Sequence, residues 1–147
     1  MQTNRVFRDV SAWYHLVCVW DSANATAGNR MRMYVNGVEE TSFATDTNPA
    51  EDANATWGNT SHPIEVGRRG SNGTQYFDGY MAEVAVCDGQ AYAASDFGEF
   101  DEDSPTIWKP KDISGLTFGT SGFYLDFEAS DNLGNDANGG TDFTESN

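Results

Sequence analysis

The sequence predicts an all-β protein built as an antiparallel sandwich, and three observations lead to that prediction. The chain is rich in aromatic residues, with 9 Phe, 6 Tyr and 4 Trp among 147 residues, and aromatic side chains favour strands. Leu is scarce, whereas Gly, which is costly inside a helix, occurs 15 times. Short extended segments alternate with polar turns along the chain, which is typical of sandwiches and barrels. The length predicts one domain.

The N-terminal part contains three extended segments. Residues 13–20 form a continuous apolar and aromatic run, which predicts a central strand covered on both faces. Residues 30–35 alternate with a period of two, and Asn36-Gly37 follows. Because both residues of a two-residue hairpin turn need a positive φ, Asn-Gly predicts a hairpin that continues into residues 38–43.

The remaining elements are shorter or more interrupted. Strands are predicted at residues 63–69 and 75–87, and Gly79 inside the second indicates a bulge or a close backbone approach. Residues 91–97 are the only plausible helix, with Ser95 as its candidate cap. Residues 123–128 are the last predicted strand. Two segments are expected to be irregular, a polar loop at 44–61 and an acidic, proline-containing crossing at 99–112.

The charge balance excludes several classes of partner. The chain has 23 acidic and 8 basic residues, a net charge of −15, which repels nucleic acid and anionic membrane surfaces. No apolar run has the length of a membrane span, and the first residues lack the apolar core of a signal peptide. We therefore expect no nucleic-acid or membrane partner. We also expect folding in a reducing cytosol, with Cys18 and Cys87 as free thiols rather than a disulfide.

The spacing of carboxylates argues against catalysis. Retaining glycoside hydrolysis needs two carboxyl groups about 5–5.5 Å apart, which alternate positions of one strand provide. Glu83 has no acidic neighbour at that spacing, whereas Asp126 and Glu128 share a face of the last predicted strand without a third acid. His15 lies inside the aromatic strand, where we expect it to be packed. The sequence therefore predicts a protein that is not an enzyme, with a glucanase-like hydrolase as the least favoured alternative.

Four motifs follow one another in an order and spacing that resemble a known family. They are Trp13-Tyr14-His15-Leu16-Val17, Arg32-Met33-Tyr34-Val35-Asn36-Gly37, Ile64-Glu65-Val66-Gly67 and Phe77-Asp78-Gly79-Tyr80-Met81-Ala82-Glu83-Val84. Over roughly residues 10–98 the chain resembles the laminin-G-like, concanavalin A-like jelly roll. The resemblance implies a sandwich of the lectin and glucanase type.

The continuation of the chain resembles virion-associated proteins of tailed bacteriophages, especially marine ones. The residues that carry this resemblance lie at 88–91, 95–99, 108–111 and 122–127. It implies a structural or host-recognition part of a phage virion, such as a capsid decoration, fibre or tail-associated protein. Such a protein would be assembled in the host cytoplasm, and its partners would be other virion proteins or identical subunits. The alternative is a carbohydrate-binding module for polysaccharide on the host surface.

The jelly roll that this resemblance implies is incomplete at its front. Family domains usually have further strands ahead of the Trp-Tyr-His strand, and only about twelve residues precede it here. Residues 123–144 resemble the opening strand and loop of such domains. Three explanations are open: the chain is a fragment, its C-terminal strand fills the missing place, or a neighbouring subunit supplies the missing strands.

Candidate glycan-binding residues lie on predicted loops that could converge at one end of the sandwich. Sugar recognition uses aromatic platforms and planar polar groups. The candidates of these kinds are Trp57, Asn59, Arg68, Arg69, Asn72 and Tyr76. Two alternatives stay open: Trp57 plugs the fold beneath its loop, and the arginines pair with surface acids.

The C-terminal residues are the stronger of two places where the pattern suggests a cofactor, and that cofactor is calcium. We expect one sandwich domain over residues 1–128 and a loose, acidic, Gly- and Asn-rich tail over residues 129–147. Calcium prefers several oxygen ligands, and the tail offers Asp131, Asp136, Asn138 and Asp142. The alternative is a solvated, turn-forming tail. The acidic run 101–103 is a weaker candidate.

Overall fold

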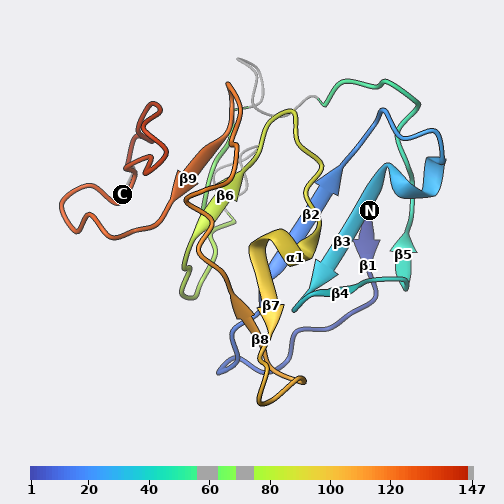
Figure 1. Ribbon diagram of the computed structural model, residues 1–147, viewed down its shortest axis with the longest axis horizontal. Coiled ribbons are helices and arrows are strands. Elements are labelled where there is room, and N and C mark those ends of the chain that lie inside the picture. Colours follow the sequence, from blue (N-terminus) through green and yellow to red (C-terminus); the bar gives the residue numbers. More distant parts are fainter. Residues whose placement is uncertain (56–62, 69–74, 146–147) are drawn as a thin grey trace. The chain divides into compact units, whose positions relative to one another are not determined.

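The computed structural model describes residues 1–55, 63–68 and 75–145. The chain divides into two units, one of Met1–Ala53 with Val86–Phe123 and one of Asn54–Ala85 with Tyr124–Asn147. The regular secondary structure consists mainly of short strands (Figure 1). The strands are β1 (Gln2–Thr3), β2 (Leu16–Trp20), β3 (Met31–Val35), β4 (Val38–Glu39), β5 (Phe43–Thr45), β6 (Val84–Val86), β7 (Gly98–Phe100), β8 (Trp108–Pro110) and β9 (Phe123–Leu125).

Helical structure is limited, within the described ranges, to two short elements. They are the 3₁₀ turn η1 (Ala27–Asn29) and the four-residue helix α1 (Ala94–Phe97). The Asp96 carboxylate accepts a hydrogen bond from the Ala93 N–H at 2.7 Å, so Asp96, rather than the predicted Ser95, satisfies the start of α1. None of the described helices has the length and apolar character needed to cross a membrane.

The first sheet of the larger unit has the strand order β2-β3-β4. β2 and β3 are antiparallel, with Cys18 opposite Met33 at the centre of the pairing. Asn36 has φ 49° and Gly37 has φ 75°, the left-handed conformation that a tight hairpin turn requires. The predicted Asn-Gly hairpin is therefore confirmed.

The burial of β2 alternates, and the prediction of a strand covered on both faces is wrong. Val17 and Val19 are buried and pack with Ala94 of α1, whereas Leu16 and Cys18 on the other face are exposed. Because every residue of β2 is apolar, the sequence held no alternation that could have separated the two faces.

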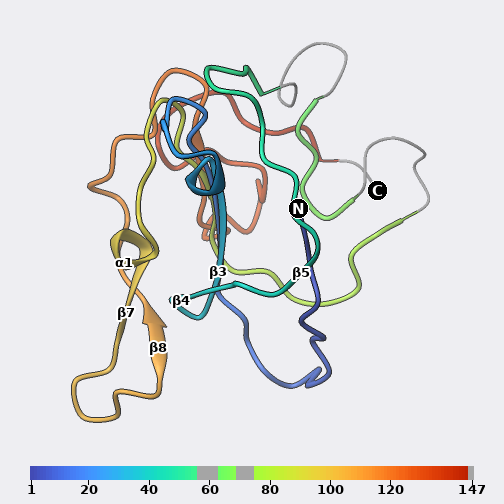
Figure 2. The same cartoon turned by 90° about the vertical axis from the view of Figure 1, so that its right-hand side faces the viewer.

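The segment 99–112 is not an irregular crossing, because it contains an antiparallel hairpin. β7 pairs with β8, and Phe100 lies opposite Trp108. Figure 2 shows α1 leading directly into β7, with β8 returning alongside it. Pro110 ends β8, a position where its missing N–H costs no hydrogen bond inside the sheet.

β1 and β5 form a further antiparallel pair in the larger unit. The predicted strand 38–43 is split into β4 and β5, with Glu40 buried between them. Thr3 Oγ1 donates to Glu40 Oε2 at 2.8 Å, and Arg5 Nε donates to Glu40 Oε1 at 2.5 Å. These contacts fasten the N-terminal residues to the segment after β4.

β6 and β9 form a two-stranded sheet, so the C-terminal strand of the described chain pairs with a strand about forty residues earlier. Only the last part of the predicted strand 75–87 is regular. The described part of the predicted strand 63–69 contributes a single antiparallel bridge, between Arg68 and Tyr76.

Candidate functional site

Two of the six predicted glycan-binding residues lie within the described chain, and they are adjacent. Arg68 and Tyr76 form an isolated antiparallel bridge, and the Phe77 N–H donates to the Gly67 carbonyl at 2.8 Å beside it. The other four, Trp57, Asn59, Arg69 and Asn72, lie outside the described residues.

Arg68 is held by an acid of the same unit. Its guanidinium forms an ion pair with Glu65. The hydrogen bond with Glu65, and a weaker one with Tyr76, raise the pKa of Arg68. The alternative in which this arginine pairs with an acid is therefore confirmed for Arg68. The carboxylate of Glu65 balances part of the positive charge of the guanidinium.

Exposed aromatic rings follow the bridge. Tyr76 is 68% exposed and Tyr80 is 88% exposed, and Phe77 between them is exposed as well. Exposed aromatic residues that lie this close together in the sequence are candidates for a binding site. A Cβ atom on Gly79 would lie 2.9 Å from Cζ of Phe77. The Phe77 ring therefore lies against the backbone of Gly79. This is the close approach to the backbone that the sequence predicted as one of two roles for Gly79.

Sequence reasoning missed Phe77 and Tyr80 because both were assigned to a long strand. A signal was available in the run Tyr76-Phe77-Asp78-Gly79-Tyr80. Three aromatic residues around an Asp-Gly pair are as compatible with a loop as with a strand interior.

The predicted metal ligands of the tail are partly assembled, around Asp136. This buried carboxylate accepts hydrogen bonds from the N–H groups of Tyr124, Asn138 and Gly140, at 2.8, 3.0 and 3.1 Å. Both of its oxygens are therefore engaged by backbone donors. Asp136 organises the turns that follow β9 in its unit.

Asp142 lies next to Asp136, and Asp131 is exposed. Asp142 accepts hydrogen bonds from the Asp136 N–H and the Asn132 amide, and these bonds, in that order, lower the pKa of Asp142. Over the described ranges, no three acidic, His or Cys side chains are grouped as metal ligands. Calcium binding stays a prediction, tested by melting the protein with and without calcium.

The weaker acidic candidate, residues 101–103, belongs to the turn of the β7–β8 hairpin. Asp101 Oδ1 accepts from the N–H groups of Asp103 and Ser104, at 3.1 and 2.9 Å, and Asp101 Oδ2 lies 3.3 Å from Lys109 Nζ. The hydrogen bond from Lys109 is the largest of the effects that lower the pKa of Asp101.

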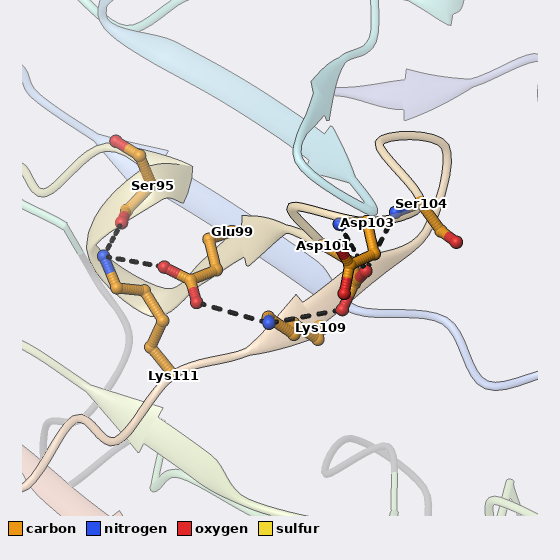
Figure 3. A network of polar contacts seen from close by, with 7 residues as sticks. All are labelled: Ser95, Glu99, Asp101, Asp103, Ser104, Lys109 and Lys111. Carbon is orange, nitrogen blue, oxygen red and sulfur yellow. Dashed lines mark hydrogen bonds and ion pairs between the residues drawn. The ribbon is translucent and has the colours of Figure 1, made fainter.

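The same network continues along the hairpin to α1 (Figure 3). Glu99 lies 3.7 Å from Lys109 Nζ and 3.9 Å from Lys111 Nζ. Lys111 also donates to the Ser95 carbonyl at 3.2 Å. Because the lysines are paired with these acids, the network fastens the hairpin to the helix.

The glucanase alternative required acidic side chains that alternate along one strand, and Asp126 and Glu128 do not have that arrangement. β9 ends at Leu125, and Asp126 Oδ1 accepts from the Glu128 N–H at 3.1 Å. Phe127 between them has φ 59°. Asp126 and Glu128 therefore lie in a turn, and the expectation that they share a strand face is wrong.

The other reactive side chains of the larger unit are His15, Cys18 and Cys87. The ring of His15 lies 5.9 Å from that of Trp108, which confirms its predicted packing, and burial lowers the pKa of His15. Cys18 and Cys87 are free thiols, as predicted. The side chain of Cys18 reaches the surface and that of Cys87 is half-buried, and desolvation by the atoms around each thiol raises the pKa of both. A raised pKa keeps a thiol protonated and unreactive.

Antiparallel pairing of short strands, with little helix, defines the class of protein: the chain is an all-β jelly roll. A family model described as the concanavalin A-like lectin/glucanases superfamily, of the laminin G type, matches residues 2–95. The chain therefore belongs to this superfamily, and its domain suits carbohydrate binding or a structural role. Comparison with curated proteins and with solved structures gives no match.

Proposed function

We propose that the chain is a non-enzymatic carbohydrate-binding domain. The observation that carries the proposal is the exposure of three aromatic residues in one short segment, Tyr76, Phe77 and Tyr80, of which Tyr76 pairs with Arg68 across the antiparallel bridge. Aromatic faces stack on the apolar face of a sugar ring, and a guanidinium donates to hydroxyl oxygens. The superfamily, which includes lectins, supports the same conclusion.

The absence of catalysis is part of this proposal. It is supported by the turn that separates Asp126 from Glu128, since a retaining hydrolase needs two opposed carboxyl groups. A reducing-sugar assay on the polysaccharides that the domain retains tests it. Release of reducing ends above the buffer rate would make the protein a hydrolase.

We further propose that the domain acts as part of a tailed-phage virion, in contact with other virion proteins. The observation that favours this setting is the resemblance of residues 88–91, 95–99, 108–111 and 122–127 to phage virion proteins. Mass spectrometry of purified particles that encode the chain tests it. Particles that lack the protein would contradict the virion role and leave glycan binding untouched.

Affinity electrophoresis through gels of bacterial polysaccharides tests glycan binding. The parent protein should be retarded, and Tyr80→Ala and Tyr76→Ala should each lose most of the retardation, because a stacking contact contributes about 1 kcal/mol or more. Trp13→Ala is the matched control, since Trp13 is an exposed aromatic residue of the other unit. Equal retardation of all three variants would show that the site does not lie in the segment that contains Tyr76 and Tyr80.

A further inference from the structure

We propose that the glycan site binds neutral polysaccharide and excludes acidic polysaccharide, and that Glu65 sets this preference by neutralising Arg68. The inference rests on the proposed function, because it names the class of glycan that the same site would bind. Uronic acids, sulfates and phosphates are the groups that make a polysaccharide acidic. The residues that argue for their exclusion all belong to one unit of the chain.

Arg68 is the base on which recognition of an acidic sugar would depend, and an acid of the protein already neutralises it. Free guanidinium groups bind carboxylates and phosphates through two parallel hydrogen bonds. The guanidinium of Arg68 forms an ion pair with Glu65, and both side chains are partly buried. Partial burial removes some of the water and salt that would screen the pair. An acidic group of a ligand would therefore have to displace Glu65.

The ion pair balances the charge of Arg68 and leaves hydrogen-bond donors. A guanidinium has five N–H groups, and the side chain of Arg68 is 35% exposed. Glu65 and Tyr76 both form hydrogen bonds with it. The N–H groups that these two residues do not use can donate to sugar hydroxyls, which require no net charge on the donor. A neutral sugar therefore keeps the contact that the proposed function assigns to Arg68.

The aromatic segment itself carries a negative charge. Asp78 lies between Phe77 and Gly79, and it is exposed. Tyr76 and Tyr80 are each two residues away from it, a span of at most about 7 Å along the backbone. The Debye length at physiological salt is about 8 Å. A carboxylate or sulfate on a sugar bound to either tyrosine would therefore be repelled by Asp78, and salt would screen that repulsion only in part.

The unit that contains the site is acidic as a whole. Asn54–Ala85 and Tyr124–Asn147 contain nine Asp and Glu residues, no lysine and two arginines, Arg68 and Arg69. Arg69 lies outside the described residues. An excess of one sign of charge opposes the approach of a polymer of the same sign. Neutral polysaccharide meets no such opposition.

Affinity electrophoresis with matched derivatives of one polysaccharide tests the class of glycan. The neutral polysaccharide that retards the parent most is compared with its lightly substituted hydroxyethyl and carboxymethyl derivatives. Both derivatives add bulk, and only the carboxymethyl derivative adds charge. An acidic reference protein corrects for the charge of the gel. The hydroxyethyl form should retard the parent, and the carboxymethyl form should bind it at least about threefold more weakly at low salt.

Two variants test the role of Glu65. Glu65→Gln removes a negative charge and keeps an oxygen that can accept a hydrogen bond from Arg68, and circular dichroism verifies its fold. It should reduce the difference between the two derivatives about twofold or more. Glu128→Gln is the matched control, because Glu128 is an exposed residue of the same unit and its substitution changes the net charge equally. It should leave the difference unchanged.

Equal binding of the carboxymethyl and hydroxyethyl forms by the parent would overturn the preference for neutral glycans and leave glycan binding intact. This comparison needs no variant, so it decides the class of glycan even if Glu65→Gln does not fold. Retardation by alginate and hyaluronate, without retardation by neutral polysaccharides, would overturn the inference as well. Equal effects of the two variants would overturn the role of Glu65 and assign the preference to net charge. If no polysaccharide retards the parent, the proposed function fails and this inference fails with it.

Discussion

Arg30 shows how one side chain replaces regular structure in this fold. Arg30 is 8% exposed, and its guanidinium donates to the carbonyls of Asn24, Ala25 and Pro49, at 2.8, 3.3 and 3.1 Å, and to Glu51 at 3.0 Å. A rigid guanidinium fork with five donors can serve several acceptors at once. Arg30 thereby joins the loop after β2 to the polar segment after β5.

We expect Arg30→Ala to lower the free energy of unfolding by about 2–3 kcal/mol, because three backbone carbonyls would lose a charged donor in part-buried hydrogen bonds. Glu51→Ala should cost less than about 1 kcal/mol, since Glu51 is 56% exposed. Urea denaturation measures both values. Equal losses for the two variants would mean that the ion pair, rather than the carbonyl contacts, carries the stabilisation.

His15 makes stability depend on pH near neutrality. Burial lowers the pKa of the folded-state imidazole below its ordinary value of about 6.5. Between these two pKa values the unfolded chain binds a proton that the folded chain does not, so stability falls as the pH drops through this window. We expect the urea midpoint of the parent to fall from pH 7.5 to pH 5.5, and that of His15→Gln to fall less.

The pH comparison includes its own control. His15→Gln removes one titrating group and leaves the rest of the chain unchanged, so the difference between the two pH profiles reports His15. Parallel pH profiles for parent and His15→Gln would show that His15 is as well solvated in the folded state as in the unfolded state.

At the scale of elements, one aromatic ring joins the β7–β8 hairpin to the first sheet. Trp108 packs against the core of Val17 and Val19, and its ring lies across Gly37 and Gly98. A Cβ atom on Gly98 would lie 2.5 Å from Cε2 of the ring. Only a residue without a side chain leaves room for the ring at this distance.

We expect Gly98→Ala to destabilise the protein by about 1–3 kcal/mol through overpacking against Trp108. The backbone of Gly98 is extended, with φ −166°, so crowding rather than backbone strain is the cause. Gly28→Ala is the control, because a Cβ there meets nothing within 4 Å, and it should change stability by less than about 0.5 kcal/mol. Similar melting temperatures for the two variants would place the ring elsewhere.

These elements also explain which parts of the fold the sequence could predict. The hairpin at Asn36-Gly37 depends on two residues whose conformational preferences are local, so it was predictable. The β7–β8 hairpin depends on Trp108, whose partners lie far away in the sequence. The acidic residues and prolines around it indicated a loop, and tertiary packing overrode that local preference.

The residues of the candidate site also fall into those that the sequence could predict and those that it could not. Arg68 and Tyr76 were predicted together because an aromatic side chain and a guanidinium suit a sugar, and the structure places them side by side. Phe77 and Tyr80 were not predicted, since exposure is a property of the folded chain. Asp136 was predicted as a metal ligand from its type alone. Its backbone donors come from β9 and from the turn that Asp136 closes, and sequence spacing does not reveal them.

At the scale of the whole molecule, the C-terminal part of the chain is expected to be essential for folding. Phe118, Phe123 and Leu125 are buried, and β9 pairs with β6. The Phe118 carbonyl accepts from the Asp88 N–H at 2.8 Å, and the Asp88 carboxylate accepts from the Ser121 N–H at 3.2 Å. Residues 118–125 thus supply buried side chains and backbone partners to the segment around β6.

Deletion of residues 118–147 should therefore abolish cooperative unfolding. Each of the three buried side chains is worth about 2–5 kcal/mol, and the sum approaches or exceeds the whole stability of a typical domain, about 5–15 kcal/mol. Deletion of residues 129–147 alone keeps all three and removes the contacts of Asp136, so it should lower the melting temperature and preserve the transition. Differential scanning calorimetry distinguishes the two variants. A sharp transition near that of the parent in the longer deletion would show that the remaining chain folds without β9.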